Sequence, residues 1–216
     1  MQTPKQENAE IPKALLRRIP TYFHYLNEKA NENTEYISST TIAESLHLTA
    51  IQVRKDLALI CSTSGKPRIG FEIRQLLIDI KNFLGYNIID NAILVGAGQL
   101  GRTLLSYDGF KEYGLNIACA FDSAKELHFQ KINNKYILPL EKIAEFVKQK
   151  NVRIGIITVP KQYAQEVCDL LIESGIKGIW NFAPAHLEVP EFISVKNENL
   201  AISLALLSRE LPENSD

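Results

Sequence analysis

The chain has 216 residues, 45% of them hydrophobic, and a formal net charge of −1 at pH 7. This length and composition allow a sizeable core in one or two domains, and the near-neutral charge excludes binding of nucleic acid by overall charge alone. With no signal peptide and no apolar run of about 18 residues, neither secretion nor a membrane span is expected.

A helix is predicted near the N-terminus. The first 11 residues are polar and charged and are expected to form a frayed arm. From Pro12 to about Lys29 the apolar residues recur at helical spacing, and Pro12 suits the first position of a helix. Because proline removes a backbone donor and clashes with the preceding turn, we expect Pro20 to cause a kink or a short restart.

Two short helical patterns follow in quick succession. Ser39 and Thr40 open the first, over residues 41–46, and Thr49-x-x-Gln52 is a capping box that opens the second, over residues 50–60. Two helices joined so closely predict a helix-turn-helix, which reads DNA with its second helix. Glutamine can pair with adenine, arginine can pair with guanine, and lysine can pair with a phosphate. The expected DNA-contacting residues of this motif are Ser39, Thr49, Gln52, Arg54 and Lys55. An ordinary surface helix is the alternative.

A basic hairpin is predicted directly after these helices. Gly65 and Pro67 mark its turn, Lys66 and Arg68 its tip, and a strand is expected to resume at residue 69. The hairpin makes the motif a winged helix, with both charges placed for phosphates or the minor groove; a surface turn that aids solubility is the alternative. A helix over residues 75–84, capped by Gly85, closes a domain predicted to span residues 1–85.

A glycine-rich turn opens the second half of the chain. An apolar strand runs into Gly96-Ala97-Gly98-Gln99-Leu100-Gly101, the spacing that lets a strand turn into a helix around a pyrophosphate. About 20 residues later a second apolar strand ends at Asp122, where a ribose diol is held. The carboxylate favours NAD(H) over NADP(H). The alternative is a tight turn and a strand-end residue with no ligand.

The rest of residues 86–196 alternates strand and helix, which predicts a Rossmann-type doubly wound parallel sheet in an α/β fold. Ligands bind at the carboxyl ends of such strands. Two segments are therefore candidates for the nicotinamide end of the site, with plain turn chemistry as the alternative: Thr158-Val159-Pro160 and Asn181-Phe182-Ala183-Pro184.

The C-terminal segment, residues 197–216, is predicted to contain a helix from Asn197 to Leu211 that is apolar around its whole circumference. Such a helix must be buried on most sides. A partner subunit or its own domain are the two surfaces that can bury it.

The cysteines and histidines form no pattern typical of a metal site. Cys61, Cys119 and Cys168 include no CxxC pair, and the four histidines have no ligand spacing. We therefore predict no metal, and sparse reduced thiols indicate the cytoplasm. Cys119 and Cys168 lie in apolar runs typical of core packing, which leaves Cys61 as the one thiol to test for a redox role.

With these parts assembled, the chain resembles the Rex family of redox-sensing transcriptional repressors over about residues 12–210. The resemblance implies a homodimer that binds a palindromic operator when NADH is scarce and releases it when NADH binds, whereas NAD+ competes without driving release. It also implies exchange of the C-terminal helix between subunits and control of fermentation and respiration genes. The motifs that carry it are Ile51–Leu57, Gly70-Phe71, Gly96–Gly101, Phe121-Asp122, Thr158–Pro160, Gly175–Ile179 and Asn181–Pro184.

The chain departs from the family pattern at residues implied to couple its halves. The family has an arginine, a tyrosine and an aspartate where this chain has His24, Tyr107 and Asn199, so an ion pair is replaced by neutral or weakly charged groups. A histidine at this place would make DNA release depend on pH. Phe71 replaces an expected tyrosine, which removes one hydroxyl near the wing.

Two other functions compete with the repressor. A catalytic NAD-dependent dehydrogenase would need a substrate domain, and too few residues follow the glycine-rich turn for one; no proton-transfer constellation is found either. In a structural or protein-binding module, the nucleotide would only stabilise the fold. We therefore expect no enzymatic activity, with NADH and NAD+ acting as effector ligands.

Overall fold

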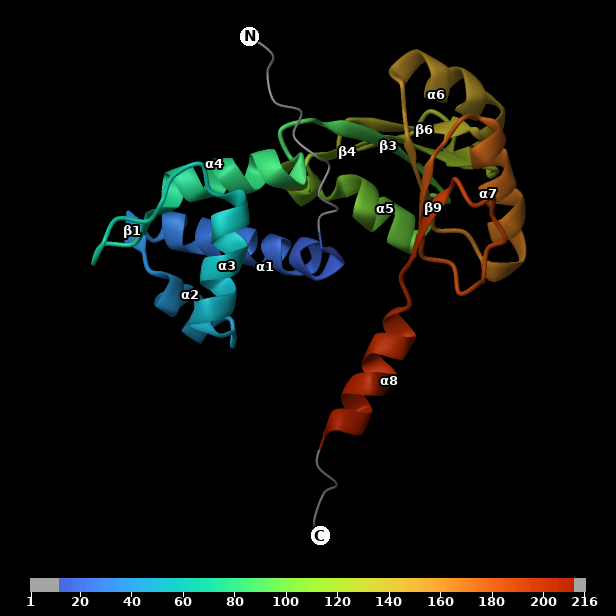
Figure 1. Cartoon of the computed structure of the whole chain (residues 1–216). Helices are drawn as coiled ribbons and strands as arrows, with labels where there is room; N and C mark the ends of the chain where they lie inside the picture. The colour runs from blue at the N-terminus through green and yellow to red at the C-terminus, as the bar shows by residue number, and fades with distance from the viewer. Residues whose placement is uncertain (1–11, 212–216) are drawn as a thin grey trace. The chain divides into compact units, whose positions relative to one another are not determined.

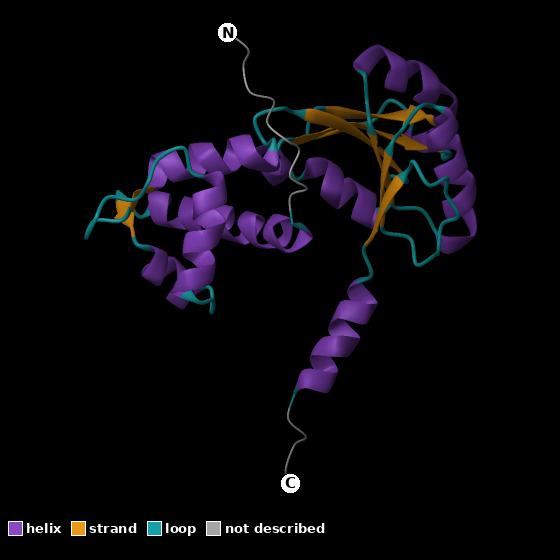
Figure 2. Ribbon diagram, viewed as in Figure 1, coloured by secondary structure: helices purple, strands orange, loops and turns teal. Residues whose placement is uncertain are grey.

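A computed structural model describes residues 12–211, which divide into two compact units (Figures 1 and 2). The first unit ends at Asn87 and the second begins at Ile88. The N-terminal arm expected over residues 1–11 and the chain beyond residue 211 lie outside the described residues.

The first unit is a small helical domain with a two-stranded sheet. Its core lies between α1 and α4 and is filled by large apolar side chains such as Tyr22, Phe23 and Ile80. α1 runs unbroken through Pro20, so no restart occurs there: Ile19 and Tyr22, on either side of the proline, are both fully buried. Its elements are α1 (Lys13–Asn31), β1 (Tyr36–Ile37), α2 (Ser39–Ser45), α3 (Ala50–Ile60), β2 (Phe71–Glu72) and α4 (Ile73–Leu84).

The helix-turn-helix is confirmed, with one correction at its start. Thr49 Oγ1 accepts from the backbone N–H of Gln52 at 3.1 Å, as the capping box predicts, and α3 begins at Ala50. The first helix is capped one residue earlier than expected. The hydroxyl of Ser38, not Ser39 or Thr40, accepts from Thr41 N at 3.0 Å and starts α2 at Ser39.

The wing strand is shorter than expected and its partner lies before the helix-turn-helix. β2 begins at Phe71 rather than at residue 69 and pairs antiparallel with β1, with Ile37 opposite Phe71. The tip closes through a bridge between Lys66 and Gly70. Gly70 has φ +101°, and a Cβ there would collide with the carbonyl of Ile37, so only glycine allows this turn.

The second unit is built on a seven-stranded sheet in the order β5-β6-β4-β3-β7-β8-β9. All neighbours pair in parallel except β5 and β6, and the order reverses between β3 and β7, as in a Rossmann fold. The strands are β3 (Asp90–Val95), β4 (Leu115–Asp122), β5 (Lys131–Ile132), β6 (Lys135–Pro139), β7 (Ile154–Ile157), β8 (Gly178–Asn181) and β9 (Ser194–Asn197).

Helices cover both faces of this sheet (Figure 1). On one face α6 (Ile143–Lys150) and α7 (Ala164–Glu173) bury Val147 and Leu171. On the other face α5 (Gln99–Ser106) buries Leu105. The predicted doubly wound α/β fold is confirmed. Short 3-10 turns join these elements over Asp108–Tyr113, Lys125–Leu127, Leu140–Lys142 and Lys161–Tyr163.

The C-terminal helix is shorter than predicted and exposed. Residues 194–197 form β9, so α8 begins at Leu200 and ends at Glu210. Four of its apolar side chains are more than half exposed, from 54% at Leu207 to 67% at Leu204, with Ile202 and Leu206 between them. Within the described part of the chain, therefore, its own domain does not bury this helix.

Candidate dinucleotide and DNA-binding sites

Sheet register brings the predicted ligand residues to one edge. Val95 lies beside Phe121 on one side and Ile157 on the other, so the next residues along each strand, Gly96, Asp122 and Thr158, meet at the carboxyl ends of β3, β4 and β7. This is the point where the strand order reverses and where open α/β sheets bind ligands.

The three glycines have different physical roles. Gly96 has φ +103°, and a Cβ there would lie 2.8 Å from the carbonyl oxygen of Thr158. A Cβ at Gly101 would collide with the carbonyl oxygen of Gly96, so this glycine lets α5 pack on the strand end. Gly98 is the opposite case, because nothing lies within 4 Å of the position its Cβ would take.

Gly98 leaves the start of α5 open to an anion. It is the N-cap residue and carries no side chain that could satisfy the first N–H groups; its carbonyl accepts from Arg102 N at 2.9 Å. Arg102 Nε also donates to the Ala97 carbonyl at 2.9 Å, which fixes the loop. Free N–H groups and the positive end of the helix dipole together favour a phosphate at this place.

Asp122 joins the loop to the adjacent strand. Its Oδ2 accepts from Ala97 N at 2.6 Å and its Oδ1 from Ala124 N at 2.8 Å. A carboxylate has about four acceptor positions, so each oxygen keeps one for a ribose hydroxyl. The side chain can therefore order the loop and hold a ribose together.

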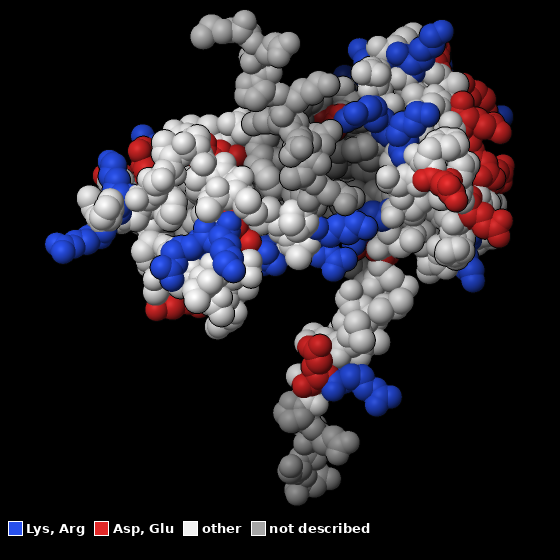
Figure 3. Space-filling model, in the orientation of Figure 1, with Lys and Arg blue, Asp and Glu red and all other residues white. Residues whose placement is uncertain are grey.

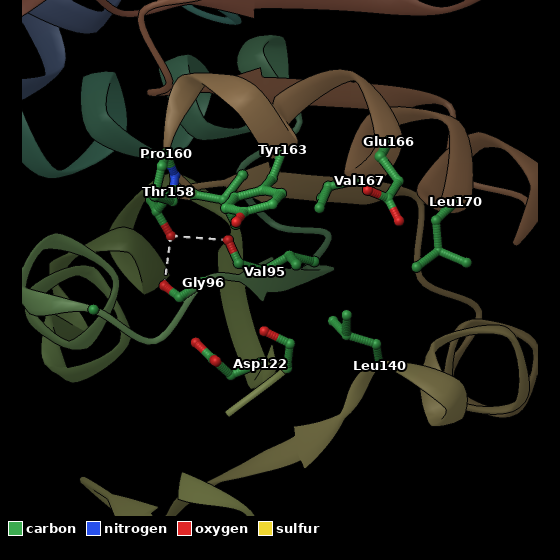
Figure 4. Close-up of a pocket in the computed structure, with 13 residues that line it drawn as sticks. Val95, Gly96, Asp122, Leu140, Thr158, Pro160, Tyr163, Glu166, Val167 and Leu170 are labelled. Carbon is green, nitrogen blue, oxygen red and sulfur yellow. Dashed lines mark hydrogen bonds between the residues drawn. The ribbon is translucent and has the colours of Figure 1, made fainter. Parts of the chain in front are cut away.

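A cavity of about 500 Å³ lies over these groups (Figure 4). It brings together Gly96, Gly98, Asp122, Thr158, Val159 and Pro160 from the predicted set. The predicted residues Ala97, Gln99, Leu100 and Gly101 do not line it. Sequence reasoning missed six lining residues besides Val95: Ser123, Leu140, Tyr163, Glu166, Val167 and Leu170.

The signal for most of the missed residues is helical spacing. Tyr163, Glu166, Val167 and Leu170 follow Pro160 at intervals of three and four, which places them on one face at the start of α7. A helix that follows a ligand-binding strand end presents such a face to the ligand. The sequence analysis predicted alternating strands and helices here, but no ligand contact from this helix face.

The second nicotinamide candidate lies outside this cavity. The Asn181 side chain is buried: its Nδ2 donates to Ala185 O at 3.0 Å and to Asn197 Oδ1 at 2.9 Å, and its Oδ1 accepts from Ala183 N at 2.9 Å. These bonds shape the segment up to Pro184. Thr158, in contrast, donates its hydroxyl to Gly96 O at 2.8 Å and so fastens the glycine loop to β7.

The predicted DNA-contacting side chains are solvent-accessible in the first unit. Arg54, Lys55, Lys66 and Arg68 are exposed, and Figure 3 shows Lys and Arg gathered over α3 and at the wing. Lys66 Nζ lies 5.2 Å from the centre of the Tyr36 ring, a cation–π contact that holds the wing lysine beside β1. Thr49 is exposed and Ser39 half-buried.

A buried carboxylate fixes the recognition helix to the core. Asp56, 2% exposed, accepts a two-point bond from Arg18 at 2.8 and 2.9 Å and further bonds at 2.8 Å from Tyr22 and Gln52. Burial alone would raise the pKa of Asp56, but these donors outweigh it and lower the pKa below its ordinary value. Burial and the carboxylate raise the pKa of Tyr22, which stays neutral.

Comparison with known proteins decides the family. A Rex redox-sensing transcriptional repressor of Treponema denticola is 41% identical over 192 residues, which cover 89% of this chain and 91% of that protein. The Rex repressor of Carboxydothermus hydrogenoformans is 39% identical over 199 residues, 92% of this chain and 95% of that protein. This chain belongs to the Rex family.

Solved structures of a Rex-family repressor called RSP have the same architecture. RSP in complex with β-NAD+ and operator DNA is 33% identical, with a TM-score of 0.84, over 93% of this chain and 92% of that chain. RSP in complex with β-NADH is 32% identical, with a TM-score of 0.82, over 93% of this chain and 94% of that chain. Family models described as "Putative DNA-binding protein N-terminus" and "CoA binding domain" match residues 10–58 and 87–185.

The three residues expected to couple the two halves each have a local partner. His24 Nε2 lies 3.3 Å from Glu28 Oε1 on α1, and Asn199 Oδ1 accepts from Ile202 N at 3.0 Å to cap α8. Tyr107, 56% exposed, meets Phe110 edge-on with ring centres 4.9 Å apart. Phe110 contacts Trp180, which contacts Phe182, so aromatic rings connect Tyr107 with the second nicotinamide candidate.

Cys61 is the thiol for which the sequence left a redox role open. Burial raises the pKa of the Cys61 thiol to about 11, so little reactive thiolate forms at neutral pH. Among residues 12–211, no three His, Cys, Asp or Glu side chains are placed to hold a metal ion. No helix in the described residues is long and apolar enough to cross a membrane.

Proposed function

We propose that this Rex-family chain is a cytoplasmic, homodimeric repressor that binds a palindromic operator and is released from it by NADH, whereas NAD+ binds without causing release. The observation that carries this is the open N-terminus of α5 at Gly98 beside Asp122 and the cavity, in one chain with a basic helix-turn-helix. RSP, which shares both units, has been solved with NADH and with NAD+ and operator DNA.

The charges around the cavity favour NAD(H) over a ligand with an extra ribose phosphate. Asp122 and Glu166 are acidic, and no Lys or Arg is among the described residues that line it. The ribose 2′-phosphate of NADP(H) or the 3′-phosphate of coenzyme A would therefore meet carboxylates without a balancing cation. NAD(H) therefore fits the charges of this cavity better than coenzyme A, the ligand for which the matching family model is named.

In the proposed repressor each segment has one task. Residues 1–85 contact DNA through Ser39, Thr49, Gln52, Arg54, Lys55, Lys66 and Arg68. Residues 86–196 bind the dinucleotide, with Gly96 to Gly101 at the diphosphate and Asp122 at a ribose. Thr158 to Pro160 and Asn181 to Pro184 lie at the nicotinamide end. The exposed apolar side chains of α8, within residues 197–216, are the surface for exchange with a second subunit.

In this proposal operator binding and NADH binding affect each other reciprocally. If NADH weakens operator binding 10- to 100-fold, operator weakens NADH binding by the same factor, or about 1.4–2.8 kcal/mol. A ligand of equal affinity for both states shifts nothing, so the reduced ring must make contacts that the charged oxidised ring does not. The ring chain from Phe182 to Tyr107, together with His24 and Asn199, is the proposed route.

Fluorescence anisotropy of a labelled palindromic promoter fragment tests the proposal. The purified protein is titrated at fixed salt with NADH and, separately, with NAD+. Release by NADH at concentrations where NAD+ does little supports the sensor. Retention of DNA under both nucleotides contradicts it, absence of operator affinity favours a protein-binding module, and steady hydride turnover favours a dehydrogenase.

A further inference from the structure

We propose that Glu166 determines which base the dinucleotide site accepts, by taking a hydrogen bond from the 6-amino group of adenine. This inference rests on the proposed binding of NAD(H) and assigns a task to a side chain that the glycine motif does not include. The cavity surrounds the place for the base with three apolar residues and one acceptor.

The order of groups along the cavity locates the base. The diphosphate belongs at Gly98 and the ribose at Asp122, as argued above. Beyond Asp122 the lining turns apolar, with Leu140 on one side and Val167 and Leu170 of α7 on the other (Figure 4). A flat, weakly polar purine gains from burial between such side chains, whereas the charged ring of the oxidised nicotinamide does not.

Glu166 lies on the same face of α7 as Val167 and Leu170, and Figure 4 shows its carboxylate directed toward the cavity. Its side chain makes no hydrogen bond or ion pair with any of the described residues. Two other glutamates of the second unit, in contrast, are engaged: Glu145 accepts from Gln149, and Glu198 from Trp180. Glu166 therefore keeps its full acceptor capacity for a ligand.

An ionised carboxylate can only accept hydrogen bonds, and this decides the base. The 6-amino group of adenine donates. The 6-oxo group of hypoxanthine or guanine is itself an acceptor, so two oxygens would face each other. Glutamine at this position would suit both bases, because its amide can turn to present either its oxygen or its NH2 group.

The experiment compares NADH with reduced nicotinamide hypoxanthine dinucleotide, whose base carries a 6-oxo group and a proton on N1 in place of the 6-amino group and the unprotonated N1 of adenine. Isothermal titration calorimetry gives both dissociation constants for the wild-type chain, Glu166→Gln and the control Glu173→Gln. Glu173 is an exposed glutamate at the end of the same helix and does not line the cavity. The ratio of the two constants is the readout, since removing a negative charge from the cavity changes the affinities for both anionic dinucleotides together.

We expect the wild-type chain and Glu173→Gln to bind NADH about 10-fold more tightly than the hypoxanthine analogue, the size of one charge-assisted hydrogen bond at a partly exposed site. Glu166→Gln should lower the ratio to about 2-fold or less. Equal affinities in the wild-type chain, or an unchanged ratio in Glu166→Gln, would overturn the inference. Failure of the wild-type chain to bind NADH at all would instead contradict the proposed function.

A second variant separates base selection from general loss of the site. Tyr163 also lines the cavity but is placed between Thr158 and Val167, away from the base position (Figure 4). Tyr163→Ala should weaken both dinucleotides alike and leave their ratio near the wild-type value. If it removed the discrimination as Glu166→Gln does, the selectivity would belong to the shape of the pocket rather than to the carboxylate.

Discussion

Gln52 on the recognition helix donates its side-chain amide to Asp56 at 2.8 Å, one turn further along the same helix. Asp56 is in turn held by Arg18 and Tyr22 of α1. The residue predicted to read adenine is therefore oriented by the core of its own domain. This bond occupies one of the two N–H groups of the Gln52 amide, which leaves the second N–H and the carbonyl oxygen for a two-point contact with adenine.

Replacing Asp56 with asparagine should destabilise the first unit by about 2–3 kcal/mol. The change leaves a guanidinium and a buried hydroxyl without their charged acceptor; the figure is below that for a fully buried pair because Arg18 is 28% exposed. Urea unfolding followed by circular dichroism measures it. Glu32→Gln, which breaks the surface pair with Lys29, is the control and should cost less than about 0.5 kcal/mol.

The contribution of Asp56 should also depend on pH in a definite direction. Its pKa is lowered in the folded state, so the carboxylate stabilises the fold fully above the unfolded value of about 3.9, and this stabilisation is lost as pH falls through the folded pKa. The stability difference between the wild-type chain and Asp56→Asn should be constant from pH 7 to about 5 and shrink below about pH 4. A difference that grows with acidification would contradict the assignment.

Two glycines of one motif should respond differently to alanine. Gly98→Ala meets open space and has φ −70°, so the fold is kept, but the new methyl group occupies the diphosphate position and NADH affinity falls at least about 10-fold. Gly101→Ala collides with the Gly96 carbonyl and should lower the melting temperature of the second unit. Calorimetric melting and NADH titration of both variants distinguish the effects. Equal melting temperatures would show that α5 can shift away from the strand.

The charges of the wing residues Lys66 and Arg68 should contribute to the salt dependence of operator affinity. If Lys66 and Arg68 each neutralise one phosphate, replacing either with alanine lowers the slope of log affinity against log salt by about 0.9. Operator titrations over a range of salt concentrations measure this slope. Lys148→Ala, an exposed lysine on α6, is the control and should leave the slope unchanged. A wing variant with an unchanged slope would show that its charge does not contact the backbone.

Local signals predicted the parts of the fold that depend on local chemistry. The cap of α3 at Thr49 and the left-handed Gly85 after α4 are both as predicted. The second half of the predicted capping box is not formed, because the Gln52 side chain bonds to Asp56 instead. The features that the sequence did not indicate depend on pairing between strands that lie far apart in the chain. The wing strand begins where Ile37 can pair with it, more than 30 residues earlier, and residues 194–197 become β9 because β8 offers a free edge.

The same division holds for the candidate site. The glycine spacing and Asp122 were visible because each is a local backbone requirement. Glu166 and Leu140 were not, since only the sheet order brings the start of α7 opposite the residue after β6. The sequence also could not indicate that the buried Asn181 side chain bonds to Ala183, Ala185 and Asn197, so a nicotinamide contact from this segment stays a prediction.

The exposed apolar side chains of α8 predict that two copies of the chain associate through this helix. Leu204 and Leu207 are 67% and 54% exposed in the single chain, which is unfavourable for large apolar side chains in water and is relieved by a second subunit. The double variant Leu204→Glu, Leu207→Glu should therefore elute as a monomer in size-exclusion chromatography with light scattering, and its operator affinity should fall at least about 100-fold because one half-site is lost. NADH binding should persist, since neither residue lines the cavity. A variant that remains dimeric would place the subunit interface elsewhere on the chain.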